Sequence, residues 1–209
     1  MYLLIFYPPI KRSEVKSTLL YLLRHGPTAA PKGCFVGSTD VSLSGQGLAR
    51  LKGLTDHLQP VERWYCSPML RTRQTFARLR QAEGLLNDPV YDQRLREIDF
   101  GRWEMQTFAE IAATDPEQLE SWSQYVDFAF PAGEPVSDFI SRTEEMLSLF
   151  SAAESSNIGV VTHGGIIRTM ICLALGLSVQ NYLLFEVQPA SLTLLELFSQ
   201  GGILRGLNI

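Results

Sequence analysis

Two histidines and two arginines of this sequence stand where they could bind and attack a phosphate group. Arg24 and His25 end one apolar run, His163 ends another, and Arg71 lies shortly after a third. A neutral imidazole can act as a nucleophile, and a guanidinium binds two phosphate oxygens at once. Each residue alone would be an ordinary surface or loop residue, so the inference of phosphoryl transfer depends on their meeting at one place.

The apolar runs predict strands that would bring these residues together. Short, nearly continuous runs are typical of strands covered on both faces in a parallel sheet. Because helical patterns alternate with them, the fold class is α/β, an open and mostly parallel sheet with helices on both faces. Ligands of such sheets bind outside the carboxyl ends of the strands, where the runs before His25 and His163 end. The predicted strands are 19–23, 61–66, one near Val90, 158–162, 191–198 and 203–207, and the predicted helices are about 42–58, 67–83, 134–153 and 164–175.

Local signals place the helix ends. Ser42 or Ser44 can cap the first helix, and Ser67 followed by Pro68 predicts the start of the second. The helix that follows His163 presents free backbone N–H groups, and Gly164 would let an anion approach them closely. Gly164 is therefore a candidate phosphate contact.

The chain reads as one domain, 18–209, preceded by an N-terminal extension, 1–17. A helical pattern over 107–128, broken at Asp115-Pro116, predicts a helical insertion at about 102–135. The apolar run near the N-terminus is short, is broken by prolines and precedes the lysines, so we do not expect a signal peptide. No apolar run reaches the roughly 18 residues of a membrane span.

The composition limits the kinds of partner that the protein is expected to bind. The 209 residues carry a formal net charge of −4, so we expect no nucleic-acid partner and no membrane partner. The three cysteines are widely spaced; Cys66 and Cys172 lie in apolar runs and are expected to be buried thiols, which favours the cytoplasm. An oligomer is possible, and the sequence does not determine one. Of the three histidines, His57 falls in mid-helix, which leaves no ligand set for a metal.

Six ordered blocks resemble the histidine phosphatase superfamily, which includes the cofactor-dependent phosphoglycerate mutases. The resemblance covers almost everything from Leu19 onward, and although RHG alone is a weak string, the ordered set is specific. The blocks are LRHGPT (23–28), GSTDVSLS (37–44), CSPMLRTRQT (66–75), LREIDFGRWE (95–104), PAGE (131–134) and THGG (162–165).

This resemblance implies a phosphoglycerate mutase-like fold and a phosphomonoesterase of the histidine acid phosphatase type that needs no cofactor. It implies that His25 becomes phosphohistidine, that Arg24, Arg71 and His163 surround the transferred phosphoryl group, and that Glu97 protonates the leaving oxygen. Thr28 is retained and could donate its hydroxyl to phosphate.

Two features depart from the family pattern or leave a choice open. Pro31 stands where the family often has a phosphate-binding asparagine, and Pro135 stands where a serine commonly follows the Gly-Glu pair. Asp99 and Glu104 compete with Glu97 for the role of acid. Motif position favours Glu97, spacing alone does not choose, and a salt bridge to Arg94 or Arg102 is the alternative for any of the three.

Other phosphatase chemistries do not fit the spacing. Only four residues separate Cys66 from Arg71, one fewer than the cysteine-phosphatase loop requires, and no DxD or Walker motif is present. Within the superfamily, the short 102–135 segment favours hydrolysis over a phosphoglycerate mutase, which must shut out water. A module that binds a phosphorylated partner without turnover is the alternative of another class, and the presence of an acid argues against it.

The substrate prediction depends on finer resemblances. Residues 100–105, the region of Trp122 and residues 204–208 look like α-ribazole phosphatases, which remove a 5′-phosphate during cobalamin nucleotide-loop assembly. A broad sugar-phosphate or phosphoglycerate phosphatase is the alternative. Aromatic residues of the insertion could stack on a flat base or could simply pack it onto the sheet. These are Trp103, Phe108, Trp122, Tyr125, Phe128 and Phe130.

Overall fold

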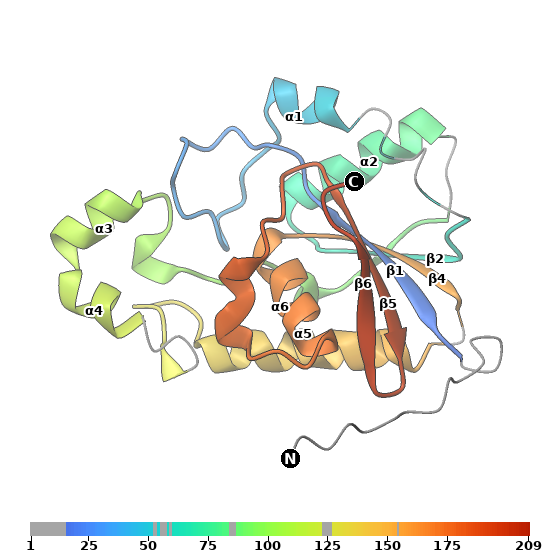
Figure 1. Ribbon diagram of the computed structural model, residues 1–209. Helices are drawn as coiled ribbons and strands as arrows, with labels where there is room; N and C mark the ends of the chain where they lie inside the picture. Colours follow the sequence, from blue (N-terminus) through green and yellow to red (C-terminus); the bar gives the residue numbers. More distant parts are fainter. Residues whose placement is uncertain are drawn as a thin grey trace, which may run out of the picture.

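The strands form a six-stranded sheet in the order β3-β2-β4-β1-β5-β6 (Figure 1). This computed structural model describes residues 16–51, 54, 58, 60–83, 87–122, 127–153 and 155–209. The first four strands are mutually parallel, and β5 and β6 run antiparallel along one edge, so the prediction of an open, mostly parallel α/β sheet is confirmed. The strands are β1 (Thr18–Arg24), β2 (Arg63–Cys66), β3 (Val90–Tyr91), β4 (Asn157–Thr162), β5 (Leu192–Phe198) and β6 (Gly201–Gly206).

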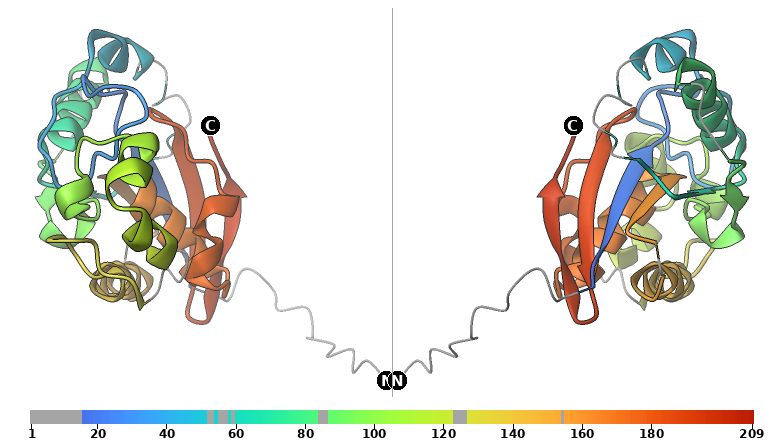
Figure 2. Two further views of the ribbon diagram at one scale, coloured as in Figure 1. Left: turned by 90° about the vertical axis from the view of Figure 1, so that its left-hand side faces the viewer. Right: turned by 90° about the vertical axis from the view of Figure 1, so that its right-hand side faces the viewer.

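Helices cover both faces of this sheet (Figures 1 and 2). Leu20 and Leu22 of β1 pack with the apolar side chains of α5 and α6, whereas Tyr21 and Leu23 pack with those of α2. Because successive side chains of a strand point to opposite faces, a strand between two helical layers must be apolar throughout. The helices are α1 (Gly45–Arg50), α2 (Leu70–Glu83), α3 (Phe108–Thr114), α4 (Pro116–Ser121), α5 (Val136–Ser151) and α6 (Gly164–Ala174), with 3-10 turns η3 (Gln93–Leu95), η4 (Gly101–Trp103) and η6 (Val179–Leu184).

Helix α1 begins as the sequence predicts. The hydroxyl of Ser44 accepts a hydrogen bond from the backbone N–H of Gly47, which is the capping arrangement expected of serine. The helix ends at Arg50, earlier than the predicted Leu58, and much of the segment between these residues lies outside the described part of the chain. Leu51 is buried, and Leu54 and Leu58 pack against the α2 side of the core.

The predicted start of α2 at Ser67 is wrong, because the helix begins at Leu70. The hydroxyl of Ser67 lies 2.8 Å from Nε2 of His163 instead of capping the helix. The backbone N–H of Leu70 donates to Oδ1 of Asp40 at 2.6 Å. A carboxylate from a distant loop therefore takes the place of the local cap.

Helices α3 and α4 stand at one side of the molecule, beside the loop that follows β1 (Figures 1 and 2). They are separated at Asp115, as the sequence predicts, and Thr107 with Glu110 forms a capping box for α3. Backbone hydrogen bonds join Phe35 to Gln106 at 2.9 Å and Met105 to Phe35 at 2.8 Å. The segment just before α3 is thus hydrogen-bonded to the loop that follows β1.

The proposed division of the chain remains a prediction, since residues 1–15 lie outside the described part. Among the described residues, no helix is both long and apolar enough to cross a membrane.

Candidate active site

The carboxyl ends of β1 and β4 bring the two predicted histidines together. These strands are neighbours, and Arg24 is paired in register with Thr162, so the residues that follow each strand end emerge side by side. The ring centres of His25 and His163 lie 5.2 Å apart. Nε of Arg71 donates to Nδ1 of His163 at 3.2 Å. Three segments far apart in the sequence therefore meet at one edge of the sheet.

His25 is held in one tautomer. Its Nδ1 lies 2.8 Å from the carbonyl oxygen of Gly26, and because a carbonyl can only accept, Nδ1 carries the proton. The other ring nitrogen, Nε2, then keeps its lone pair. His25 is 7% exposed and lines a cavity of about 890 Å³. A buried imidazole with a free Nε2 is the state that a nitrogen nucleophile needs.

His163 and Arg71 lie behind His25, and both are fully buried. Since an arginine Nε always donates, Nδ1 of His163 accepts, and its proton is on Nε2, 2.8 Å from the hydroxyl oxygen of Ser67. Arg71 also donates from Nη1 to the carbonyl of Thr39 at 2.9 Å and from Nη2 to that of Gly37 at 2.7 Å. Protein groups therefore fix both side chains before any ligand enters.

Burial and positive neighbours keep both histidines neutral. Desolvation lowers the pKa of His25 and of His163 well below the ordinary value of 6.5, and the nearby Arg71 lowers both further. Burial also lowers the pKa of Arg24 and of Arg71, which Glu97 opposes through its negative charge. The site thus joins neutral imidazoles with buried guanidinium groups.

These pKa shifts predict that stability falls on acidification. The unfolded chain binds protons near pH 6.5 that buried His25 and His163 do not bind, so the free energy of unfolding rises with pH between their lowered pKa values and 6.5. The free energy of unfolding therefore decreases as the pH falls through this window, by up to about 1.4 kcal/mol per pH unit for each histidine. Urea unfolding between pH 5.5 and 7.5 measures the slope, which His163→Gln should reduce. Equal slopes in both proteins would contradict this assignment.

Arg24 has an unsatisfied donor. Its Nη1 donates to the carbonyl of Val187, but its buried Nε has no hydrogen-bond partner among the described residues. A buried N–H without a partner is unfavourable by about 1–3 kcal/mol, so this group is poised to bind an acceptor. A Cβ on Gly164 would lie 3.3 Å from Cζ of Arg24, so the glycine leaves room for the guanidinium.

Some of the predicted site residues line the cavity at His25, which is called the main cavity below. Its volume is about 890 Å³, and Arg24, His25, Thr28 and Glu97 are in its wall. Arg71 and His163 belong to the layer behind, and Gly164 packs against Arg24 instead of facing the cavity. The structure thus brings these residues together and places them in two layers, a cavity wall and the layer behind it.

Of the three candidate acids, Glu97 lines the cavity that His25 also lines. Its Oε2 accepts from the backbone N–H of Gly165 at 3.0 Å, and a Cβ on Gly165 would fall 2.3 Å from Oε1, so a larger residue there would force the carboxylate to move. Asp99 instead accepts from the N–H of Gly101 at 2.8 Å, and Glu104 binds the 37–39 loop. The spacing of the three carboxylates in the sequence could not decide which of them is the acid.

The alternative salt bridges to Glu97 do not form. Arg94 pairs with Asp92 and Glu145, and Arg102 pairs with Asp115. Glu97 therefore stays available to the cavity.

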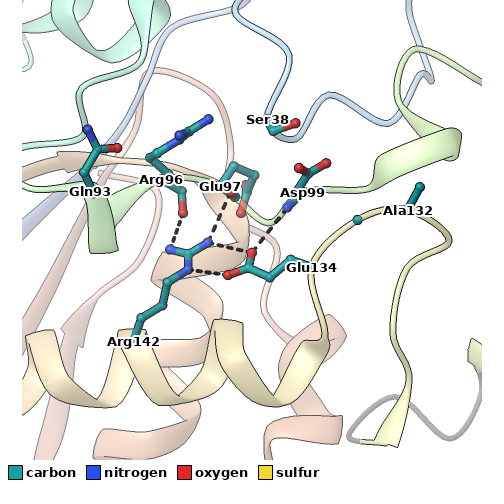
Figure 3. A pocket seen from close by; sticks show the side chains of 9 residues that line it. Ser38, Gln93, Arg96, Glu97, Asp99, Ala132, Glu134 and Arg142 are labelled. Carbon is teal, nitrogen blue, oxygen red and sulfur yellow. Dashed lines mark hydrogen bonds and ion pairs between the residues drawn. The ribbon is translucent and has the colours of Figure 1, made fainter.

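Arg142 fixes the backbone that carries Glu97 (Figure 3). It pairs with Glu134 at 2.7 Å and donates to the carbonyls of Arg94 and Arg96 at 2.6 Å and of Glu97 at 3.2 Å. These groups border a polar cavity of about 350 Å³ on one side of Glu97. Glu134, which precedes α5, therefore holds the segment of Glu97 in place through its ion pair with Arg142.

The alternative nucleophile Cys66 is unsuited. It is fully buried, and burial raises the pKa of its thiol to about 12, so the reactive thiolate is absent at neutral pH. Cys172 is buried as well, as predicted. In the described part of the chain, no three His, Cys, Asp or Glu side chains gather as a metal site would require.

Comparison with known proteins decides the family. A model of the histidine phosphatase superfamily, branch 1, matches residues 20–209. The chain belongs to this superfamily. An adenosylcobalamin/alpha-ribazole phosphatase of Salmonella typhimurium is 29% identical over 194 residues, which are 90% of this chain and 95% of the relative. Phosphoserine phosphatase 1 of Hydrogenobacter thermophilus is 26% identical over 195 residues, 91% of this chain and 92% of the relative.

A solved structure shows the same fold. The α-ribazole phosphatase of Shigella flexneri has a TM-score of 0.79 at 27% identity, covering 92% of this chain and 96% of the other. The expected superfamily, its phosphoglycerate mutase-like fold and a phosphomonoesterase are therefore confirmed. The roles of single residues remain predictions.

A second, largely aromatic cavity adjoins the main one in this histidine phosphatase. Its volume is about 260 Å³, and Glu97 and Arg168 line both cavities. The buried Nε1 of Trp122 has no hydrogen-bond partner among the described residues. The aromatic side chains of the wall are Phe35, Phe100, Trp122, Phe130, Phe139 and Tyr182.

The predicted aromatic surface is thus only partly right. Trp122 and Phe130 line the cavity, but Trp103 and Phe128 are buried in the core and Phe108 is 57% exposed. Tyr125 lies outside the described residues.

Three polar residues of this histidine phosphatase have contacts at the site that the sequence does not predict. Ser67 has the sequence pattern of a helix cap, and Glu104 has the same chemistry as Glu97. Arg168 follows His163 within α6 and donates from Nε to the carbonyl of Phe185 at 2.9 Å. A basic residue one turn into a helix that starts at the site was the signal that could have identified it.

Proposed function

We propose that this enzyme hydrolyses phosphomonoesters through a phosphohistidine on His25, without a metal. The observation that carries the proposal is the state of His25, which lines the cavity and whose Nδ1–H is held by Gly26, so that Nε2 keeps its lone pair. The partnerless Nε–H of Arg24 supplies a donor for a phosphate oxygen beside it. Together they offer a nucleophile and a charge-assisted anion contact in one cavity.

The proposed first step transfers the phosphoryl group to the enzyme. Nε2 of His25 bonds to phosphorus, the ester P–O bond breaks, and the leaving oxygen takes a proton from Glu97. The ring becomes positively charged while Nδ1–H remains bonded to the carbonyl of Gly26, which stabilises that charge. Arg24 binds the phosphoryl oxygens directly, and Arg71 and His163 complete the cradle from behind.

The proposed second step regenerates the enzyme. The carboxylate of Glu97 takes a proton from water, the water oxygen bonds to phosphorus, and the P–N bond to His25 breaks with release of phosphate. The short 102–135 insertion supports hydrolysis over mutase chemistry, because it leaves less chain to close the site against water. The free thiols of Cys34, Cys66 and Cys172 support a cytoplasmic setting for this reaction.

As substrate we propose α-ribazole 5′-phosphate, which places the enzyme in assembly of the cobalamin nucleotide loop. The aromatic cavity next to Glu97 suits a flat base, since aromatic pairs stack at an angle or offset. Nε1 of Trp122 offers a donor to a polar atom of such a base. Relatives named adenosylcobalamin/alpha-ribazole phosphatase support the same choice.

Arg168 favours a second candidate, an anionic leaving group such as that of phosphoserine. The guanidinium lines both cavities, and it forms no ion pair with any carboxylate of the described chain. A carboxylate next to the phosphoester would satisfy it. Phosphoserine phosphatase 1 of Hydrogenobacter thermophilus is a relative consistent with this alternative.

A substrate panel in EDTA tests both candidates. We expect kcat/KM for α-ribazole 5′-phosphate to exceed that for phosphoserine, 3-phosphoglycerate and glucose 6-phosphate. Trp122→Ala should lower the α-ribazole value about tenfold through loss of stacking and leave phosphoserine within about twofold. The matched control is Phe108→Ala, an exposed aromatic of the same insertion.

The possible outcomes test the substrate and the mechanism separately. A profile led by phosphoserine would replace the substrate with the second candidate, and a flat profile would make the enzyme a broad phosphatase. Loss of turnover in EDTA that returns with added metal would overturn the metal-independent mechanism.

A further inference from the structure

The carboxylate of Glu104 is the most heavily bonded acceptor beside the active site. Oε1 accepts from the backbone N–H groups of Ser38 at 2.7 Å and Phe100 at 3.0 Å and from the hydroxyl of Ser38 at 3.4 Å. Oε2 accepts from the N–H groups of Gly37 and Thr39, both at 3.1 Å, and from the hydroxyl of Thr39 at 2.6 Å. Six donors therefore converge on one partly buried side chain.

The loop that Glu104 holds is the loop that holds Arg71. The N–H groups of Gly37 and Thr39 point to Glu104, while the carbonyls of the same two residues accept Nη2 and Nη1 of Arg71. Arg71 in turn donates from Nε to His163. A continuous chain of hydrogen bonds thus runs from Glu104 through the 37–39 loop to the histidine pair.

The 37–39 loop packs closely against the segment that carries Glu97 and Glu104. A Cβ on Gly37 would fall 2.0 Å from the carbonyl oxygen of Ile98 and 2.5 Å from Oε1 of Glu104. Glycine is therefore required for the loop to reach the segment that carries both Glu97 and Glu104. The negative charge of Glu104 also opposes the burial that lowers the pKa of Arg71.

We propose that Glu104 is a positioning residue that sets the Arg71 guanidinium, through the 37–39 loop, for phosphoryl transfer at His25. This inference rests on the role proposed above for Arg71. A structural role alone would affect folding, whereas a positioning role affects the oxyanion contacts and the state of His163.

The test compares Glu104→Gln with Asp115→Asn, a matched amide replacement. Asp115 accepts from Nε1 of Trp103 at 3.0 Å and so anchors the same segment without touching the 37–39 loop. In Glu104→Gln, an amide NH₂ must face backbone donors, because both carboxylate oxygens accept. With p-nitrophenyl phosphate as substrate, we expect Glu104→Gln to lower kcat/KM at least about tenfold. We expect the inhibition constant of orthovanadate to rise by a similar factor. In Asp115→Asn both should stay within about twofold.

Two further measurements separate positioning from folding. The pKa of the His163 imidazole, followed by NMR, should rise in Glu104→Gln because Arg71, which lowers it, is displaced. Thr39→Val, which removes one donor to Glu104, should lower kcat/KM several-fold and serves if Glu104→Gln does not fold.

A double-mutant cycle decides the mechanism. In an Arg71→Lys background, Glu104→Gln should lower kcat/KM by less than about a further twofold, since both changes act on one contact. Fully additive effects, or a folded Glu104→Gln enzyme that matches Asp115→Asn, would overturn the inference and leave the proposed function intact. An Arg71→Lys enzyme as active as wild type would instead remove the role of Arg71 on which it rests.

Discussion

Replacement of His25 by alanine is expected to abolish turnover, with kcat for p-nitrophenyl phosphate lowered by at least about 10⁴-fold. The variant keeps Arg24 and the buried layer behind it, but the cavity wall then has no free imidazole nitrogen to attack phosphorus. Quenching the wild-type enzyme with alkali during turnover should trap an alkali-stable phosphoenzyme that is lost on later treatment with acid, and the variant should yield none.

The His25→Ala experiment has a matched control and a binding measurement. His57→Ala replaces the one histidine that lies outside the described residues, and it should retain both turnover and the phosphoenzyme. Inorganic phosphate should still bind to His25→Ala, since Arg24 retains its free donor. More than about a tenth of wild-type turnover in a folded His25→Ala protein is incompatible with nucleophilic catalysis by His25.

The convergence of the site could be predicted because it follows from topology. Strands that are apolar throughout belong between helical layers, and parallel neighbours end at the same edge. Knowing only that His25 and His163 each follow such a strand is enough to bring them together. The observed register, with Arg24 opposite Thr162, places them in contact.

The supporting contacts could not be predicted, because they join residues far apart in the sequence without a local pattern. Ser67 has every local feature of a helix cap, yet its hydroxyl is used by His163, and a distant carboxylate caps α2 in its place. Glu104 has the same chemistry as Glu97 and differs only in the donors that surround it. Three-dimensional context, not residue type, assigns an acid to a cavity or to a loop.

The aromatic residues follow the same principle. Trp103 and Trp122 both belong to the predicted insertion, but Nε1 of Trp103 donates to Asp115, whereas Nε1 of Trp122 has no partner in the described structure. Only the second is suited to recognise a ligand. Hydrogen-bond accounting therefore separates packing aromatics from candidate binding ones where composition cannot.

The second large effect is expected for Glu97→Gln, and its size should depend on the leaving group. For alkyl phosphates, including α-ribazole 5′-phosphate, loss of the proton donor should lower kcat/KM, which reports transfer to His25, by about 10²–10⁴-fold. For p-nitrophenyl phosphate the loss of kcat/KM should be about tenfold or less, because p-nitrophenolate leaves without a proton. Glutamine can still accept the N–H of Gly165, so the geometry of the segment is retained.

A series of aryl and alkyl phosphates measures this directly, since the dependence of log kcat/KM on leaving-group acidity should steepen in Glu97→Gln. The matched control is Asp99→Asn, two residues away on the same segment, whose carboxylate caps Gly101. Its slope should equal that of wild type. If Asp99→Asn steepens the dependence and Glu97→Gln does not, Asp99 is the acid, and the contact between Glu97 and the start of α6 is structural. Because both replacements remove a carboxylate from one short segment, a shared loss of stability cancels, and only the slope identifies the residue that gives up the proton.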